Sequence, residues 1–373
     1  MTPRENMLNI LHCRDYEWTP IVFYADPYNH PDPQTLPEHL RALGEEKFPK
    51  WIDCCDTYIP ISDYLGIKEY LFQAPAPVAM YLSPDAEEVH YTEGDFTIGK
   101  ITTKSGELTE RIRKGVKVKP YCETPEDFAI FNEYVDSWRY ELCPDSIERI
   151  KRVKEAIGDN GVIILNGEGT PLGMMHRVYS KIDKIVYTLA DEPEQVEELL
   201  AHMESNYLEN IRMILENAPE IDVINGLDDT SSTIVSPSMF EHHNVELINK
   251  RVEIVEKYGR TYMHHSCGLL RHLLPVYKKA RMHGIDAFTR PPIGDITWAE
   301  GRKILGDNYS IISSAFSGSN SLSKDQVINK VHEISEDAKA ARFITLKLTS
   351  IDMHHSFELI QIALDVLRKD FGY

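Results

Sequence analysis

The sequence has no long apolar run, no glycine-rich nucleotide fingerprint and no basic leader. None of its segments approaches the roughly 18 consecutive apolar residues of a transmembrane helix, so we expect no membrane span. No G-x-G-x-x-G pattern follows a predicted strand, and residues 1–9 lack an apolar stretch behind a basic head. These absences argue against membrane proteins, secreted proteins and Rossmann-type dinucleotide enzymes.

Positive charge is scarce, since 40 Lys and Arg residues stand against 59 Asp and Glu residues, a formal net charge of −19. Binding to nucleic acid or to an anionic membrane needs a basic face, so neither partner is expected. A highly anionic substrate is disfavoured for the same reason, unless a local basic pocket offsets the charge. The six cysteines form no disulfide framework and are typical of reduced thiols, so we expect a cytoplasmic protein.

Short buried strands alternate with helices from about residue 160 onward. The predicted strands cover residues 161–165, 221–224, 260–263, 285–288, 309–313 and 343–346. Helices are predicted between them, the clearest over residues 193–217, where the apolar side chains share one face. This alternation is typical of parallel βα units.

The N-terminal part adds one more strand and a different pattern. Residues 21–24 predict the seventh strand, and an eighth is expected before residue 160. We therefore expect closure into a (β/α)8 TIM barrel rather than an open sheet. Residues 76–122 contain short β-rich runs and predict a meander of antiparallel strands inserted near the N-terminus. An apolar fraction of 42% suffices for one large core, so residues 1–373 are expected to form one domain.

Polar residues follow most of the predicted strands. Barrels of this type place their active sites at the carboxyl ends of the strands. Acids, imidazoles, a thiol and a guanidinium are therefore expected to meet at one mouth. The residues at these positions are Asn166, Glu168, Asn225, Asp228, Asp229, His264, His265, Cys267, Thr289, Arg290, Ser313, Ser314 and Thr349.

His265-Ser266-Cys267 is the most informative of these segments. At the end of a strand, residues i and i+2 point to the same side, so the imidazole and the thiolate would bind one metal ion together. Zinc suits this mixed pair, and a catalytic zinc has three protein ligands and one open position. The alternative is a buried histidine beside a small core cysteine. His264 should point the other way.

The acids at the strand ends have two interpretations each. Asp228 and Asp229 would act as a metal ligand, a general base or a substrate anchor, or they would simply cap a turn. Glu168 stands between Gly167 and Gly169, whose small size suggests backbone crowding near a ligand, and has the same possible roles.

Two basic segments near the C-terminal strands are also ambiguous. Arg290, followed by two prolines, would bind a substrate carboxylate or pair with an acid. His354 and His355 would be metal ligands or a plain start to the last helix.

Several of these segments resemble the uroporphyrinogen decarboxylase superfamily, which includes corrinoid-linked methyltransferases. The resemblance covers nearly the whole chain and implies a (β/α)8 barrel, in agreement with the alternation of strands and helices. It is carried by residues 2–8 followed by Thr19-Pro20, by Asp228-Asp229 followed by residues 234–240, by residues 265–268, and by the terminal helix with Glu358.

The decarboxylase branch of this superfamily is a poor match. Its members hold an octa-anionic tetrapyrrole through an arginine-rich motif after the first strand and use no metal. Here residues 23–33 contain no arginine and two aspartates, Asp26 and Asp32, so Coulomb repulsion would oppose that substrate.

The methyltransferase branch is a closer match. Its members hold zinc through a His-x-Cys pair and a later third thiolate. His265 and Cys267 match the pair, but no cysteine follows Cys267, and Thr349 or Ser350 stands where the third thiolate would be. The candidates for the third ligand are Glu168, Asp229, His354 and His355. A carboxylate or imidazole in this place would leave the zinc more Lewis-acidic than a second thiolate would.

The resemblance therefore implies a methyltransferase component. It would demethylate a small O- or N-methylated substrate, such as a methoxylated aromatic or a methylamine, and pass the methyl group to a corrinoid carried by a partner protein. His265, Cys267 and Glu168 would hold zinc, while Asp229, Glu168 and Arg290 are the expected catalytic residues. The alternatives are a decarboxylase of a smaller acid, with Arg290 as its carboxylate anchor, and a non-catalytic barrel that binds a corrinoid or tetrapyrrole. A homodimer is one option for the oligomeric state.

Overall fold

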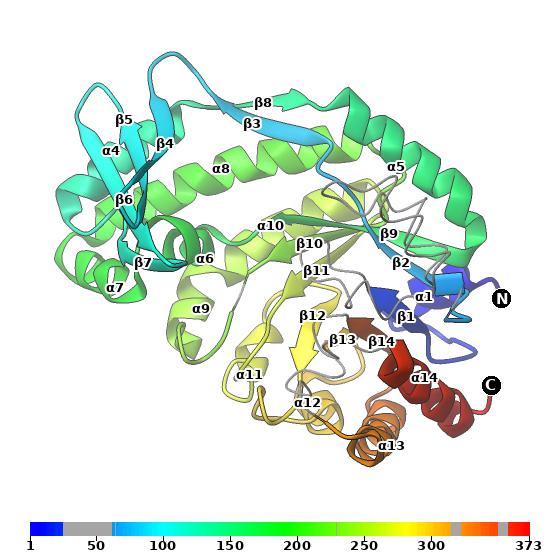
Figure 1. Cartoon of the computed structure of the whole chain (residues 1–373). Coiled ribbons are helices and arrows are strands. Elements are labelled where there is room, and N and C mark those ends of the chain that lie inside the picture. Colours follow the sequence, from blue (N-terminus) through cyan, green and yellow to red (C-terminus); the bar gives the residue numbers. More distant parts are fainter. Residues whose placement is uncertain (25–61, 64, 229, 315–321, 350–356) are drawn as a thin grey trace.

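Eight parallel strands form a nearly closed barrel in the computed structural model of the chain (Figure 1). The structure describes residues 1–24, 62–63, 65–228, 230–314, 322–349 and 357–373. The strands follow chain order around the barrel, and the first two lie in contact where it closes. They are β1 (Ile21–Tyr24), β2 (Tyr70–Gln73), β9 (Gly161–Glu168), β10 (Val223–Leu227), β11 (Thr261–His265), β12 (Gly284–Thr289), β13 (Ser310–Ser314) and β14 (Ile344–Thr349). The predicted (β/α)8 barrel is confirmed.

Helices cover the outside of the barrel, and none within the described residues is long and apolar enough to cross a membrane. Those around the barrel are α5 (Pro144–Ile157), α6 (Pro171–Met174), α7 (Ile182–Asp191), α8 (Pro193–Asn217), α9 (Pro237–His243), α10 (Val245–Lys257), α11 (Leu274–Tyr277), α12 (Trp298–Leu305), α13 (Lys324–Ala341) and α14 (Phe357–Phe371). The helix predicted over residues 193–217 is confirmed to the residue as α8. The segment between β11 and β12 contains only the short helix α11. The backbone N–H groups of Leu270 and Arg271 instead donate to the Asp295 carboxylate.

The N-terminal helix α1 (Pro3–Leu11) closes the amino-terminal end of the barrel. A capping box starts this helix. Thr2 Oγ1 accepts from the Glu5 N–H, and the Glu5 carboxylate accepts from the Thr2 N–H. Met7 and Leu11 of α1 are buried against the apolar inner face of the strands. That face consists of Val22, Leu71, Val162, Ile164, Val223, Met263 and Ile312.

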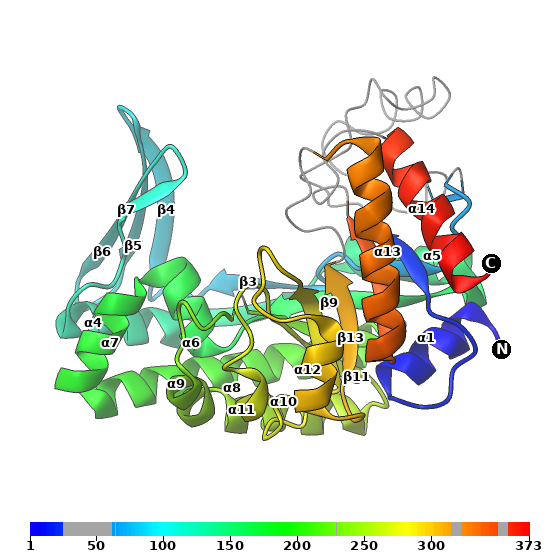
Figure 2. The same ribbon diagram turned by 90° about the horizontal axis from the view of Figure 1, so that it is seen from below.

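The β-rich region before residue 122 forms two further sheets. β4 (Glu87–Glu93), β5 (Phe96–Thr102), β6 (Glu107–Arg113) and β7 (Val116–Lys119) make the predicted antiparallel meander, which stands away from the barrel (Figure 2). β3 (Val78–Leu82) is not part of it, contrary to the prediction. It pairs instead with β8 (Trp138–Leu142), a strand beyond the predicted region. The helix α4 (Pro125–Asp136) lies between β7 and β8 in sequence.

Candidate functional site

The inner face of the barrel changes from apolar to polar toward the carboxyl ends of its strands. Side chains two residues apart on a strand share a face, so each polar residue follows an apolar one of the inner core. The paired residues are Ile164 and Asn166 on β9, Val223 and Asn225 on β10, Met263 and His265 on β11, and Ile312 and Ser314 on β13. The active-site end of the barrel is therefore lined with hydrogen-bonding groups.

Asp286 on β12 joins several of these groups into one buried network. Its Oδ1 accepts a hydrogen bond from Lys347 Nζ on β14 at 2.6 Å. Its Oδ2 accepts from Asn225 Nδ2 at 2.9 Å and lies 3.1 Å from His265 Nδ1. Asn225 Nδ2 also donates to Asn166 Oδ1 at 2.9 Å. Asp286 and Lys347 are only 5% and 7% exposed. A desolvated ion pair and its hydrogen bonds therefore link β9, β10, β11, β12 and β14.

The charge on Asp286 orients the imidazole of His265. Burial opposes ionisation of this carboxyl, but the Lys347 ammonium and the His265 hydrogen bond outweigh it and hold the Asp286 pKa well below its usual range. Facing an ionised carboxylate, His265 Nδ1 carries a hydrogen and donates it to Asp286 Oδ2. Histidines that bind metal ions are commonly oriented by a carboxylate in this way.

A β-bulge lies in β12 directly after Asp286, which faces the inside of the barrel opposite Ile312 of β13. Ala287 has φ of 61°, and the pairing with β13 shifts between Asp286 and Phe288. The extra residue restores Phe288 to the outer face, where its ring packs against Gly301 of α12. Such bulges re-aim neighbouring side chains and are common near active sites.

His264 and His265 point to opposite sides of β11, as predicted. His264 is fully buried on the outer side, with edge-on contacts to Phe240 and Tyr277 and its Nε2 3.2 Å from Thr230 Oγ1. Burial lowers its pKa to about 4, so His264 is a neutral core residue.

Cys267 lies on a loop that its neighbours hold in place. The next residue, Gly268, has φ of +86° and donates its N–H to Thr289 Oγ1 at 2.8 Å. Leu269 donates its N–H to Ser231 Oγ at 3.1 Å. The thiol, which is partly buried, is therefore positioned by contacts with the loops that follow β10 and β12.

Glu168 is the last residue of β9, and its carboxylate contacts the helix α8 outside the barrel. It accepts from Asn210 Nδ2 on α8, and burial raises its pKa. Its carbonyl oxygen accepts from Arg251 Nη1 at 2.8 Å, and Arg251 forms a buried ion pair with Glu204. Within the described residues, Glu168 forms no compact ligand group with His265 and Cys267.

The Asp228 carboxylate joins the residue after β10 to Thr170, the residue before α6. Its buried Oδ2 accepts from the N–H and from Oγ1 of Thr170, and its carboxylate lies where a Cβ on Gly173 would be. Asp229, His354 and His355 lie outside the described residues, so their roles stay predictions.

Arg290 forms an ion pair with Asp337 of α13, with Nε 2.5 Å from Oδ2, and its guanidinium lies 5.3 Å from the centre of the Trp298 ring. Asp337 also accepts from the backbone N–H groups of Trp298 and Ala299 at the start of α12. This arrangement favours the pairing alternative for Arg290 over a catalytic role. Its charge is already paired with Asp337, the carboxylate that connects α13 to the start of α12.

The sequence carries the signature of a known family. The uroporphyrinogen decarboxylase (URO-D) family matches residues 107–343, well over half of the chain. The chain belongs to this family. No curated protein matches the sequence.

Among solved structures, a methyltransferase from Methanosarcina mazei matches 100% of this chain and 98% of its own, with a TM-score of 0.61 and 13% identity. At that identity the likeness establishes a shared fold. A putative vitamin-B12-independent methionine synthase from Listeria monocytogenes matches 60% of this chain and 66% of its own, with 16% identity. Its TM-score of 0.35 is too low to support an argument.

Sequence reasoning missed two residues of the polar network, Asp286 and Lys347. The strand predicted over residues 285–288 was treated as apolar although it contains an aspartate. A charged residue inside a strand covered on both faces is a usable signal, because charges are buried only when they are paired.

Proposed function

We propose that this URO-D family member is a methyltransferase component that demethylates a small O- or N-methylated substrate. The methyl group would pass to a corrinoid carried by a partner protein. The observation that carries the proposal is His265, oriented by Asp286 at the active-site end of the barrel, with Cys267 two residues further on. The methyltransferase of the same fold from Methanosarcina mazei gives supporting context.

The residues around His265 fit a zinc ion. Asp286 holds the imidazole hydrogen on Nδ1, which leaves Nε2 as the ligand atom, and Cys267 adds a thiolate. When bound, the metal would polarise the heteroatom that carries the methyl group. The third ligand stays a prediction, with Asp229, His354 and His355 as the remaining candidates alongside Glu168.

Lys347 and Asp286 would hold the imidazole in one orientation. Their paired charges nearly cancel inside the barrel, so the carboxylate that faces His265 is itself neutralised by an ammonium. The amide of Asn225 donates to the Asp286 carboxylate from the other side and also to Asn166 Oδ1. The two amides would orient polar groups of the substrate.

The proposal is tested by zinc analysis of the tag-free protein together with methyl transfer. We expect Cys267→Ser and His265→Gln each to lose one zinc equivalent, while Cys143→Ser, a change at another partly buried thiol, keeps it. The parent should methylate added cob(I)alamin from methoxylated aromatics or methylamines, and the two site variants should not. Unchanged zinc content in both site variants, or transfer that survives in them, would refute the role of the pair.

The decarboxylase alternative is weaker, because Arg290, its proposed carboxylate anchor, is already paired with Asp337. Carbon dioxide release from a small carboxylic acid by the metal-free protein would favour it. Tetrapyrrole binding without any turnover would favour the non-catalytic alternative.

A further inference from the structure

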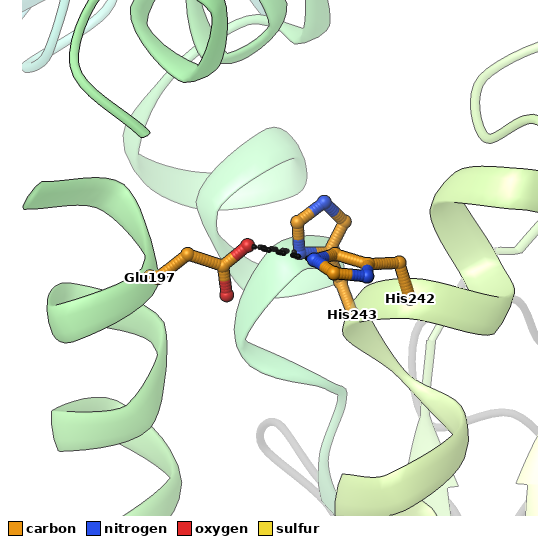
Figure 3. A group of neighbouring side chains, drawn as sticks. All are labelled: Glu197, His242 and His243. Carbon is orange, nitrogen blue, oxygen red and sulfur yellow. Dashed lines mark ion pairs between the residues drawn. The ribbon is translucent and has the colours of Figure 1, made fainter. Parts of the chain in front are cut away.

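The outer wall of the barrel carries a group of metal-ligating side chains far in sequence from His265 and Cys267. Glu197 on α8 faces His242 and His243, which form the last turn of α9 (Figure 3). Their ligand atoms all lie within 4.8 Å of one another. Among the described residues, this is the one group of three or more His, Cys, Asp or Glu side chains that meets this limit.

The distances suit a shared ion. Nε2 of His242 and Nδ1 of His243 each lie 3.2 Å from the same oxygen, Glu197 Oε1. Two ligands of a tetrahedral zinc, each at about 2.0–2.1 Å from the metal, are separated by roughly 3.3 Å. One ion between the three side chains would need only small rotations of their ends.

A simple ion pair explains the geometry less well. Nδ1 of His243 is buried and has no hydrogen-bond partner, although a carboxylate oxygen lies 3.2 Å away. The N–H direction therefore misses Glu197, and the atom is left without a hydrogen bond at a cost in stability. A metal ion accepting the lone pair would satisfy it.

The surroundings favour a cation. The side chain of His243 is only 7% exposed, so an ion bound to it would be partly shielded from water. The two histidines lie at the C-terminal end of α9, where the helix dipole stabilises positive charge. The net charge of −19 also raises the concentration of cations near the surface.

We propose that Glu197, His242 and His243 form a metal site for zinc or a similar divalent transition metal, separate from His265 and Cys267. Two imidazoles and one carboxylate leave a position for water, and this ligand set suits zinc. The bound ion would join α8 to the end of α9. Because α9 follows the loop of residues 230–236, which contacts the Cys267 loop through Ser231 and Leu269, the ion would also anchor one side of the barrel mouth.

The test uses full-length protein that carries Cys267→Ser and His265→Gln, so that the barrel site cannot contribute. The tag-free, metal-stripped protein is titrated with zinc by calorimetry and with cobalt by absorption. We expect one zinc equivalent in the micromolar range or tighter, a rise in Tm, and d–d absorption typical of nitrogen and oxygen ligands. His242→Ala and Glu197→Gln should each weaken zinc at least roughly tenfold, since loss of an outer partner alone has that effect.

The side chains of His242 and Glu197 are 72% and 45% exposed, so we expect both variants to fold like the parent. The matched control is His332→Ala. His332 also pairs with a carboxylate, that of Asp370 at 2.8 Å, but belongs to no three-ligand group among the described residues. This control should bind zinc like the parent. Absence of zinc binding in the parent, or equal affinity in Glu197→Gln, His242→Ala and the parent, would overturn the proposal. Because the barrel ligands are already removed, neither result depends on the proposed methyl transfer.

Discussion

One carboxylate, that of Asp286, determines how His265 presents its imidazole and how Lys347 is tolerated inside the barrel. Removing only one member of a buried ion pair leaves an unpaired charge. We expect Asp286→Asn to lower the free energy of unfolding by about 3–5 kcal/mol. The double variant Asp286→Asn, Lys347→Met should recover most of that loss, because both charges are gone. Urea unfolding of the three proteins measures this, and a double variant as unstable as the single one would contradict it.

The same pair of variants separates stability from metal binding. Without the negative charge, His265 is oriented less strongly, so zinc at the barrel site should bind roughly 10- to 100-fold more weakly in the double variant although its stability is restored. The titration is made in a His242→Ala background so that the outer group contributes little. Full zinc affinity in the double variant would show that Asp286 has no part in the site.

His264 gives the protein a defined sensitivity to acid. Its pKa is about 4 in the folded state and near 6.5 in an unfolded chain, so the unfolded state takes up the proton first as the pH falls. The free energy of unfolding should therefore decrease between pH 6.5 and pH 4, with no effect of this group above that window. We expect the loss between pH 7 and pH 5 to be about 2 kcal/mol smaller in His264→Gln than in the parent. Urea unfolding at both pH values measures it, and an equal loss in His264→Gln and the parent would contradict the assignment.

At the scale of single elements, the bulge in β12 lets Asp286 face the inside of the barrel while Phe288, two residues later, packs on the outside. Ala287 holds a positive φ, which a β-branched side chain tolerates poorly. We expect Ala287→Val to lower the free energy of unfolding by roughly 1–3 kcal/mol, and Ala287→Gly to change it by less than about 1 kcal/mol. Thermal and urea unfolding compare the two. Equal losses would mean that space, and not backbone conformation, limits this position.

Single helices and strands also differ in how well the sequence predicts them. The helix α8 was predicted to the residue because its apolar face repeats over many turns. The strand β2 was expected only as an unplaced eighth strand, since Tyr-Leu-Phe-Gln is too short to show alternation. The predicted place of β3 in the meander was wrong. Its ladder with β8 joins segments more than fifty residues apart, and no local pattern encodes that pairing.

At the scale of the whole molecule, the meander and the barrel share one core. Ile101 and Leu108 of the meander belong to the same buried cluster as Phe128 of α4 and the barrel wall, and Trp138 of β8 stacks on Tyr207 of α8. The two parts should therefore unfold together, which would also support the predicted single domain.

We expect Leu108→Ala to lower the stability of the entire chain by about 2–5 kcal/mol in one transition, seen alike by tryptophan fluorescence and far-UV circular dichroism. Val116→Ala, at a position 65% exposed on β7, should leave stability nearly unchanged. A separate early transition in Leu108→Ala would mean that the meander unfolds independently.

The sequence by itself determined the alternating strands and helices, hence the barrel, and the rim to which His265 and Cys267 belong. These follow from local periodicity and from the rule that parallel strands end together. Only the tertiary structure decided that Asp286 and Lys347 meet His265, that Arg290 and Asp228 have structural partners, and that Glu197 faces two histidines of another helix. These contacts join residues tens of positions apart, and their distances depend on how strands tilt, bulge and pack, which no local pattern specifies.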